Sequence, residues 1–352
     1  MTKLSNQHTI GVALSGGVDS TVTAAILLEQ GYEVHGFFML LPLADIASQI
    51  DKAKAVARQL EIPLHLVDVK DRFTTDIITS FTDAYRRGLT PNPCILCNMM
   101  IKCGLLLKRI QQKGISRMAT GHYARIEKRD KKMILRRAVD TSKDQSYFLC
   151  RLQQHQLDHL VTPLGNRRKQ SVFEQAEQMG FSFNGTESQD VCFLTKQTLA
   201  DFLMRQGVCS RPGSMVTSDD QVLGTHQGIW NYTIGQRRGL GIPDATPWYV
   251  KEIDPVNNNI IIGKNDELFI RKIFVNNVQW ALPVPVKWQG KVQLRSRHDA
   301  ADALVLPADN GHWQIIFNKA QRAVAPGQFA VFYDQDLVVG SGIIDSATHT
   351  KA

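Results

Sequence analysis

Two closely spaced cysteines have the residue type and the surroundings to do chemistry. The stretch 90–98, "TPNPCILCN", holds Cys94 and Cys97 with two residues between them. Cys192, between Val191 and Phe193 in "SQDVCF", is on its local sequence alone more typical of a small buried apolar residue. A C-x-x-C pair suits half of a zinc site, a redox dithiol, a pair of iron–sulfur ligands or the holder of an activated sulfur. The spacing alone does not choose among these four chemistries.

The surroundings disfavour two of the four. A four-cysteine structural zinc site needs a second close pair, and Cys192 has no C-x-x-C partner. A thioredoxin-like dithiol begins a helix directly after a strand, whereas "PNP" bends the approach to Cys94. Sulfur relay and iron–sulfur ligation remain.

A second candidate site is the loop "SGGVDS", residues 15–20, which follows an apolar strand and precedes a helix. Strand, glycine-rich turn and helix together offer backbone N–H groups and a positive helix end to a phosphate. Gly16 and Gly17 allow close backbone approach, Ser15 and Ser20 offer hydroxyl groups, and Asp19 is a candidate Mg²⁺ ligand. The loop lacks the lysine of a Walker motif.

The elements that position these residues alternate along the first half of the chain. We expect strands at 8–14, 33–40, 64–69 and 117–123, and helices at 20–30, 47–60 and 101–112. This order predicts an α/β domain with a doubly wound parallel sheet. Met39, Gly121 and His122 then lie at strand ends, where such folds bind their ligands.

The second half of the chain has a different pattern of apolar and polar residues. Short alternating segments, separated by turn residues, occur at 229–234, 248–253, 259–263, 272–280, 291–297, 313–317, 329–333 and 337–344. They predict two small β domains, barrels or sandwiches. The expected domains are therefore 1–195, 196–275 and 276–352.

Composition and charge narrow the class of protein. The chain has 352 residues, a formal charge of +8 and six cysteines. We find neither a signal-peptide pattern nor an apolar run of about 18 residues, so we expect a cytoplasmic protein with reduced thiols and no membrane partner. Basic clusters favour a polyanionic partner: Arg86-Arg87, Lys128-Arg129, Lys131-Lys132, Arg136-Arg137, Arg167-Arg168-Lys169 and Arg237-Arg238.

The loop resembles the PP-loop of the ATP α-hydrolases (adenine nucleotide α-hydrolase-like domains), which activate an oxygen as its AMP ester and release pyrophosphate. Four further stretches, "TPNPCILCNMMIKCG", "ATGHYAR", "SKDQSYFL" and "SQDVCFL", resemble the tRNA-specific 2-thiouridylases. So do "GTHQGIWNYTIGQRRGLGI" and "AVAPGQFAVFYDQDLVVGSGII" in the two β domains. The resemblance implies ATP- and Mg²⁺-dependent 2-thiolation of the wobble uridine, position 34, in the anticodon stem-loop of tRNA.

The resemblance also implies roles for individual residues. Cys97 matches the nucleophile and Cys192 the persulfide carrier, which a protein such as a cysteine desulfurase or a sulfur-relay protein would load. The residues matched to ATP are Ala13, Leu14, Ser15, Gly16, Gly17, Val18, Asp19, Ser20, Met39 and Gly121. Those matched to the target base or the rest of the tRNA are Asn92, Pro93, Cys94, His122, Lys143, Asp144, Gln145, Arg295, Ser296 and Gln328.

Some positions depart from the family pattern. Cys94 stands where many members have aspartate, Ser296 where a tyrosine is usual, and Phe173 where an arginine is common. The segment after Met39 is shorter and less acidic than usual. The extra thiol at position 94 keeps a second mechanism open, in which Cys94, Cys97 and Cys192 hold a 4Fe–4S cluster that carries the sulfide.

Two other classes of protein are weighed against this one. A PP-loop ligase for a small metabolite would need no second cysteine and no β domains suited to RNA. A non-enzymatic RNA-binding module would have no use for "SGGVDS" before a helix. Both are less consistent with the motifs than a tRNA sulfurtransferase.

Overall fold

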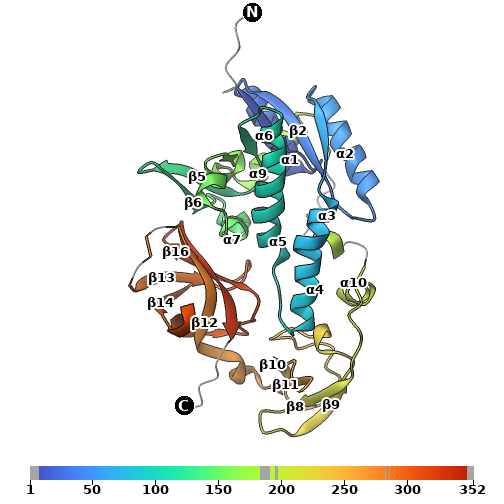
Figure 1. Cartoon of the computed structure of the whole chain (residues 1–352), viewed down its shortest axis with the longest axis vertical. Coiled ribbons are helices and arrows are strands. Elements are labelled where there is room, and N and C mark those ends of the chain that lie inside the picture. The colour runs from blue at the N-terminus through green and yellow to red at the C-terminus, as the bar shows by residue number, and fades with distance from the viewer. Residues whose placement is uncertain (1–7, 183–190, 195–196, 282, 285, 347–352) are drawn as a thin grey trace, which may run out of the picture. The chain divides into compact units, whose positions relative to one another are not determined.

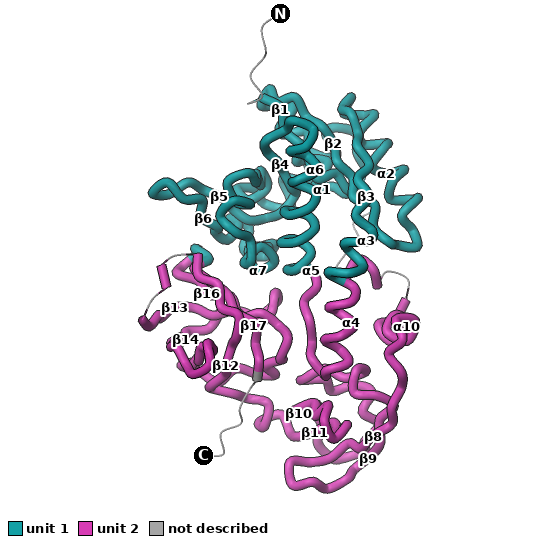
Figure 2. The backbone as a smooth tube through the Cα atoms, viewed as in Figure 1, with its two compact units in different colours: residues 1–77, 94–189, 336–338 teal, residues 78–93, 190–335, 339–352 magenta. Residues whose placement is uncertain are grey.

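The computed structural model describes residues 8–182, 191–194, 197–281, 283–284 and 286–346. They fall into two compact units, coloured separately in Figure 2. Unit 1 comprises residues 1–77, 94–189 and 336–338, and unit 2 comprises residues 78–93, 190–335 and 339–352. No helix within the described ranges is long and apolar enough to cross a membrane.

A five-stranded parallel sheet organises unit 1 and confirms the predicted α/β class (Figure 1). Its strand order is β3-β2-β1-β4-β7, and every neighbouring pair is parallel. The strands are β1 Thr9–Ala13, β2 Glu33–Leu40, β3 Leu64–Asp68, β4 Arg117–Ala119 and β7 Leu160–Val161. Because the strands are parallel, the segments after β1, β2 and β4 meet at one edge of the sheet.

Helices and one hairpin complete unit 1. The helices are α1 Val18–Glu29, α2 Ile46–Gln59, α3 Lys70–Phe73, α5 Pro93–Leu96, α6 Leu107–Gln112, α7 Ser146–Leu149, α8 Gln154–Leu157 and α9 Lys169–Gln178, with short 3₁₀ turns at Thr141–Lys143 and Pro163–Asn166. The hairpin pairs β5 Ala124–Arg129 with β6 Lys132–Arg137. The predicted strands and the first two predicted helices agree with these bounds to within a few residues.

The core of unit 1 lies between the sheet and the pair α1 and α9. Ile10 and Val12 of β1, Ile26 of α1 and Val172 of α9 belong to one cluster of fully or almost fully buried side chains. Burying each such aliphatic side chain contributes about 1.5–3 kcal/mol. Both faces of the strands are covered, which is why β1 and β2 read as nearly continuous apolar runs rather than as alternating ones.

The helical segment after Pro93 contains the main departure from the predicted elements of unit 1. The sequence predicts a helix over 101–112, but helical structure begins at Pro93 and runs through a π-helix, Cys97–Leu106, before α6. Gly104 is needed there, because a Cβ at this position would lie 2.8 Å from the Met99 carbonyl oxygen. The amide of Gln156 donates to the carbonyl oxygens of Met99 (2.7 Å) and Cys103 (3.0 Å). Gln156 thus supplies hydrogen bonds to carbonyls along the π-helix.

Unit 2 contains two β domains, as predicted. A four-stranded sheet has the order β10-β11-β8-β9, with β8 and β11 parallel. A barrel of β12-β15-β14-β13-β16-β17 is closed by pairing of β12 with β17. The strands are β8 Gly213–Val216, β9 Val222–His226, β10 Tyr249–Asp254, β11 Asn259–Gly263, β12 Phe269–Trp280, β13 Trp288–Gln293, β14 Ala301–Pro307, β15 Trp313–Arg322, β16 Phe329–Asp334 and β17 Leu337–Ser346.

One predicted strand of unit 2 is wrong. Residues 229–234 include a 3₁₀ turn, Ile229–Asn231, instead of a strand. Ile229 and Trp230 are both buried although they are adjacent, so the segment lacks the inside–outside alternation of a strand. The remaining helices of unit 2 are α4 Thr79–Arg86 and α10 Leu199–Arg205, with 3₁₀ turns at Cys192–Leu194, Asn265–Leu268 and Asp309–Gly311. A π-helical turn, Thr74–Ile78, precedes α4.

The Gln156 amide bonds lead to a stability prediction. Gln156→Leu keeps the side chain's bulk but leaves two carbonyls of the π-helix without their donor, so the free energy of unfolding should fall by about 1–3 kcal/mol. Urea unfolding followed by circular dichroism measures this. Gln154→Leu, two residues away on the exposed side of α8, is the matched control. Equal stability of the two variants would contradict the assigned role.

Candidate active site

The loop after β1 has the geometry of an anion-binding turn. Gly16 has φ +79°, and a Cβ on it would lie 2.8 Å from the backbone nitrogen of Ala53, so no other residue fits easily. Ser20 Oγ donates to the Gly17 carbonyl (3.0 Å) and accepts from the Ser15 N–H (3.2 Å). No side chain caps α1, which leaves the N–H groups of its first turn to a ligand.

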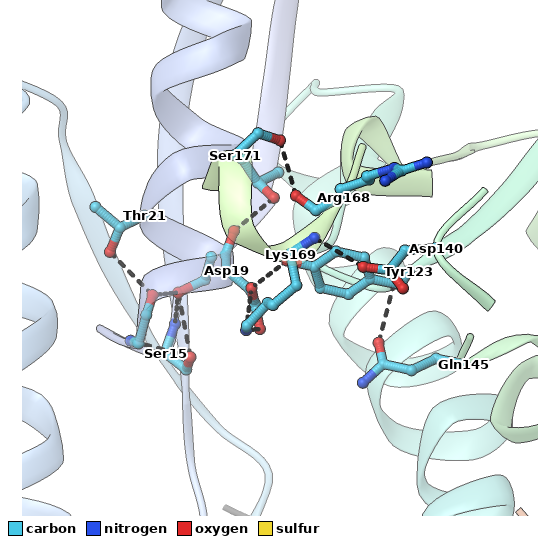
Figure 3. A network of polar contacts seen from close by, with 12 residues as sticks. Ser15, Asp19, Thr21, Tyr123, Asp140, Gln145, Arg168, Lys169 and Ser171 are labelled. Atoms are coloured by element: carbon cyan, nitrogen blue, oxygen red, sulfur yellow. Dashed lines mark hydrogen bonds and ion pairs between the residues drawn. The ribbon is translucent and has the colours of Figure 1, made fainter. Parts of the chain in front are cut away.

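A partly buried ion pair lies beside the loop (Figure 3). Lys169 Nζ, at the beginning of α9, lies 2.8 Å and 2.9 Å from the two carboxylate oxygens of Asp19. Tyr123 Oη donates to the same carboxylate at 2.8 Å. The side chain of Lys169 is only 9% exposed, and its ammonium lies over the rings of Tyr123 and Phe173 at 5.4 Å and 4.9 Å. The pair places one cation and one carboxylate at the N-terminus of α1.

Gly121 lets the end of β4 approach this pair. A Cβ on Gly121 would lie 2.8 Å from the backbone carbon of Asp19 and 2.9 Å from its Cβ. Any side chain here would therefore push β4 away from α1. The predicted nucleotide contacts at Gly121 and at Met39, the penultimate residue of β2, lie at the same edge of the sheet as the loop.

His122 is a neutral, buried histidine with both ring nitrogens engaged. Lys102 Nζ donates to Nε2 (3.5 Å), so the ring proton lies on Nδ1, which donates to Thr120 Oγ1 (2.9 Å). Burial, with the neighbouring Lys102 ammonium, holds the pKa of His122 well below its usual value. Its side chain thus holds Lys102 in place, and its predicted contact with tRNA stays a prediction.

The cysteines of "PNPCILC" differ in environment. Cys94 and Cys97 are both half-buried, and Cys97 is the first residue of the π-helix. Burial raises the pKa of the Cys94 thiol, and the charge of Lys102 opposes this increase. Burial raises the pKa of Cys103 to about 12, which agrees with a purely structural thiol there.

Asp144 and Gln145 make internal bonds in unit 1. Asp144 accepts from Arg137 Nη1 (2.8 Å) and from the backbone N–H of Ala138 (3.0 Å). Gln145 Oε1 accepts from the Tyr123 N–H at 3.0 Å. Both side chains therefore stabilise the segments that carry Tyr123 and the hairpin. Their predicted contact with tRNA, together with that of Lys143, stays a prediction.

In unit 2, Gln328 orders the segment that leads to Asn92 and Pro93. Its amide donates to the carbonyl oxygens of Thr90 (2.8 Å) and Pro91 (3.3 Å), and Gln328 is only 9% exposed. The Thr90 N–H donates in turn to the Pro326 carbonyl at 2.9 Å. The family resemblance links Gln328 to tRNA, and this stays a prediction, whereas its hydrogen bonds stabilise the irregular segment that precedes the cysteines.

Arg295 also makes bonds within unit 2. Its Nη2 donates to the carbonyl oxygens of Ile234 (3.2 Å) and Ala323 (3.1 Å). Ser296, the next residue, accepts from the amide of Gln293 through its carbonyl (3.2 Å). The predicted tRNA contacts of Arg295 and Ser296 are not tested by these bonds and stay predictions.

Cys192 is exposed, unlike a small apolar core residue. The next residue, Phe193, is buried and packs edge-on against Phe81 of α4 (5.1 Å between ring centroids) and against Phe202 of α10 (5.0 Å). This aromatic anchor holds the short turn Cys192–Leu194 while its first side chain faces outward. Residues 183–190, on the N-terminal side of this turn, lie outside the described range.

Sequence reasoning does not find the roles of Lys169, Lys102 and Gln156. In the sequence, Lys169 stands out only as one member of a basic cluster and as a match to the family pattern. The structure places Lys169 at the start of α9, which packs on α1. A lysine buried at that position needs an anionic partner, and Asp19 supplies it. Lys102 lies between Cys97 and Cys103 in the sequence, and nothing local marks it.

Comparisons with known proteins agree with the fold and the loop. Family models match in succession: the tRNA methyl transferase HUP domain over residues 8–196, the tRNA methyl transferase PRC-barrel domain over 200–264, and the Aminomethyltransferase beta-barrel domain over 270–344. A HUP domain followed by two β domains, with an anion-binding turn after the first strand, defines a class of nucleotide-using enzymes.

Full-length relatives identify the family within this class. The tRNA-specific 2-thiouridylase MnmA of Desulfotalea psychrophila is 44% identical over 339 residues, which cover 95% of this chain and 98% of that protein. The proteins of the same name from Trichlorobacter lovleyi (42%; 96% and 98% covered) and Syntrophotalea carbinolica (40%; 97% and 99% covered) are similar. The chain belongs to the tRNA-specific 2-thiouridylase family, which consists of ATP- and Mg²⁺-using sulfurtransferases, and this confirms the family predicted from the motifs.

The buried neutral state of His122 predicts a pH effect on stability. The pKa of His122 is lower in the folded protein than the value of 6.5 expected when unfolded, so below pH 6.5 the unfolded chain binds a proton that the folded chain does not. The free energy of unfolding should therefore fall as the pH falls, by up to about 1.4 kcal/mol per pH unit from this group. Urea unfolding of wild type and His122→Asn between about pH 7 and 5 measures it.

The comparison isolates residue 122 from other titrating groups. His122→Asn, which still offers a donor to Thr120, should show a flatter pH dependence than wild type. The control is His155→Asn, at an exposed position of α8. If His122→Asn and His155→Asn lose stability in parallel with wild type, His122 is not buried in its neutral form.

Proposed function

We propose that this protein catalyses 2-thiolation of the wobble uridine of tRNA, first forming an AMP ester at the C2 oxygen and then replacing that oxygen with sulfur. The observation that carries the proposal is the set of reactive groups in their motifs. A glycine loop leads into α1, which no side chain caps, beside the partly buried Asp19–Lys169 pair, and Cys97 begins a π-helix. A cytoplasmic location and a protein sulfur donor, such as a cysteine desulfurase or a sulfur-relay protein, belong to the same proposal.

The loop and the ion pair fit a nucleotide polyphosphate with Mg²⁺. The N–H groups of α1 and of the glycine turn would hold phosphate oxygens, Lys169 would neutralise a further charge, and Asp19 is the acidic group available to a metal ion. Bound ATP supplies an electrophilic phosphorus, so the C2 oxygen becomes part of a leaving group and pyrophosphate is released. The aromatic walls of Tyr123 and Phe173 keep the Lys169 ammonium from turning to solvent.

The second half of the reaction needs a sulfur nucleophile. In the proposed relay, Cys192 carries a persulfide, Cys192–S–SH, whose terminal sulfur is delivered to C2. Cys97 attacks the Sγ of Cys192, so a Cys97–Cys192 disulfide forms and the terminal sulfur leaves with the electron pair of the broken S–S bond. This sulfide adds to C2, and AMP departs with the original oxygen. An external thiol reductant then restores both cysteines.

The exposure of Cys192 supports its role as an acceptor of sulfur from a partner protein, because transfer between proteins requires an accessible thiol. The charge of Lys102 acts to lower the pKa of the Cys94 thiol and so favours anionic sulfur at that end of the C-x-x-C pair. Burial raises the pKa of the Cys94 thiol, but coordination to iron deprotonates a thiol, so this shift does not separate the two sulfur carriers. The relay is preferred because it needs only the accessible Cys192 and Cys97, and the 4Fe–4S cluster on Cys94, Cys97 and Cys192 remains the alternative.

The nucleotide role of the ion pair can be tested separately from the sulfur chemistry. Lys169→Met leaves a partly buried carboxylate unpaired and should lower the free energy of unfolding by about 1–3 kcal/mol. The double variant Asp19→Asn/Lys169→Met should recover much of this stability, because neither charge remains. Neither variant should release pyrophosphate from ATP in the presence of tRNA.

Pyrophosphate release is measured with a coupled phosphate assay, and stability by urea unfolding. A double variant that is stable but inactive places the pair in ATP use. A double variant with wild-type release of pyrophosphate would show that the pair is only structural.

The sulfur relay is tested by cysteine substitution under anaerobic conditions, in protein stripped of iron. Cys97→Ser and Cys192→Ser should each lower 2-thiouridine formation by at least about a thousandfold, because each removes a group that forms a covalent bond in the reaction. Cys94→Ser should retain activity, as should the control Cys209→Ser, at an exposed cysteine outside the motifs. Nucleosides are read by mass spectrometry after ATP, Mg²⁺ and a persulfide donor are added.

The outcomes separate the candidate mechanisms. If iron is required and Cys94→Ser is inactive, the relay is wrong and the cysteines hold a cluster. If pyrophosphate is released at the same rate without tRNA, the protein is a ligase for another substrate. If tRNA binds but no pyrophosphate is released, it is an RNA-binding module.

A further inference from the structure

The hairpin β5–β6 of unit 1 concentrates positive charge at its tip. Residues 128–132, "KRDKK", contain four cations and one anion, a net charge of +3 in a chain whose total is +8. All five of these residues are exposed. No residue among Ala13–Ser20 or Cys94–Cys97 belongs to this hairpin, so the proposed reaction does not use its tip.

The cations at the base of the hairpin have acidic partners. Arg125 and Arg136 both form ion pairs with Asp336, and Arg125 Nη1 lies 3.3 Å from Glu127. Arg137 pairs with the buried Asp144 at 2.8 Å. These pairs explain the basal arginines as structural groups that fix the hairpin to the rest of unit 1.

The cations at the tip differ from those at the base in their ion pairing. Within the described residues, Lys128, Lys131 and Lys132 have no carboxylate within ion-pair distance. Arg129 Nε lies 3.7 Å from Asp130, but both side chains are more than half exposed, so this pair neutralises little. Three ammonium groups are therefore left to solvent or to a ligand.

The backbone of the turn supports a role for the tip beyond folding. Asp130 and Lys131 both have left-handed backbone conformations, with φ of 49° and 66°. A two-residue hairpin turn of this kind is formed most easily by Asn-Gly or Asp-Gly, because glycine tolerates positive φ. Lysine at the second position adds a charge at a conformational cost that glycine would avoid.

We propose that the tip, residues 128–132, is a docking site for the phosphate backbone of the tRNA substrate. This inference rests on the proposed function. Each strand has six residues, so at about 3.3 Å per residue the tip lies up to roughly 20 Å along the hairpin from Ala124. Ala124 follows His122 by two residues, so the phosphates bound by the tip belong to RNA outside the target nucleotide.

The chemistry of the tip fits RNA backbone better than a membrane surface. Flexible ammonium groups bind phosphate as point charges without reading sequence. The five tip residues offer no apolar side chain that could insert between lipids, which interfacial binding segments normally have. The tip therefore strengthens binding of tRNA without contributing to the choice of base.

The first test removes the charges. Lys128→Gln/Lys131→Gln/Lys132→Gln is compared with Lys54→Gln/Lys108→Gln/Lys113→Gln, which removes three exposed charges elsewhere in unit 1. The dissociation constant of tRNA is measured by filter binding across a salt series. The tip variant should bind tRNA more weakly, and the slope of log K against log salt should decrease in magnitude by about three, roughly one per phosphate contact. The control should keep the wild-type slope.

A second variant separates binding from folding. Lys131→Gly removes one ammonium and relieves the left-handed backbone, so its urea midpoint should rise while its salt slope decreases by about one.

Lys128→Arg/Lys131→Arg/Lys132→Arg keeps the three charges and should bind tRNA as tightly as wild type. In the Gln variant the KM for tRNA should rise, whereas the rate of thiolation at saturating tRNA should stay unchanged.

The remaining outcomes distinguish failure of this inference from failure of the function. If wild type binds tRNA and forms 2-thiouridine but the tip variant matches the control, the docking site is wrong and the function stands. If wild type makes no 2-thiouridine, the function itself fails. If the tip variant loses binding to vesicles of anionic phospholipid but not to tRNA, the tip is a membrane site and the inference is overturned.

Discussion

The Asp19–Lys169 pair connects the parts of unit 1 on which the site depends. A lysine with so little exposure cannot stay charged without an anion, and Asp19 is placed by the first turn of α1 directly after the glycine loop. The pair therefore fixes α9 against α1 and orients Tyr123, whose hydroxyl donates to the same carboxylate. Gly121 completes the arrangement, because any larger residue would separate β4 from Asp19. Loop, helix and strand end are held in one geometry by a single charged contact.

A second constraint acts on the cysteine segment. A π-helix is normally rare and short, and its carbonyls need donors if they are buried. Here Gln156, which lies far away in the sequence, gives both amide hydrogens to the run that begins at Cys97. In unit 2, Gln328 acts in the same way on Thr90 and Pro91. The boundary between the two units lies between Pro93 and Cys94. Gln328 thus stabilises the backbone before this boundary, and Gln156 stabilises the backbone after it.

The sequence predicts much of this architecture because local chemistry decides it. "SGGVDS" after an apolar strand specifies a turn that only glycine can make, and the apolar runs of β1 and β2 specify a sheet covered on both faces.

The π-helix could not be predicted, since it depends on hydrogen bonds from Gln156 across more than 50 residues. The strand predicted over Ile229 and Trp230 is wrong because their burial is decided by neighbours in space. The hairpin β5–β6 escapes prediction because charged residues occupy four of the six positions in β5 and three of the six in β6, which masks the alternation of the strands. The roles of individual site residues follow from family motifs, and the internal bonds of Asp144, Gln145 and Arg295 could not be read from those motifs.

The π-helix also sets the helical phase of the residues before it. An α-helix turns by about 100° per residue, and a π-bulge accommodates one more residue than an α-helix of the same length would hold. The ten residues Cys97–Leu106 make fewer turns as a π-helix than they would as an α-helix, so a change to α-helix at the same residue count would rotate Cys97 relative to α6. The direction in which this thiol points is therefore encoded by the hydrogen bonds that keep the run wide as well as by residue type.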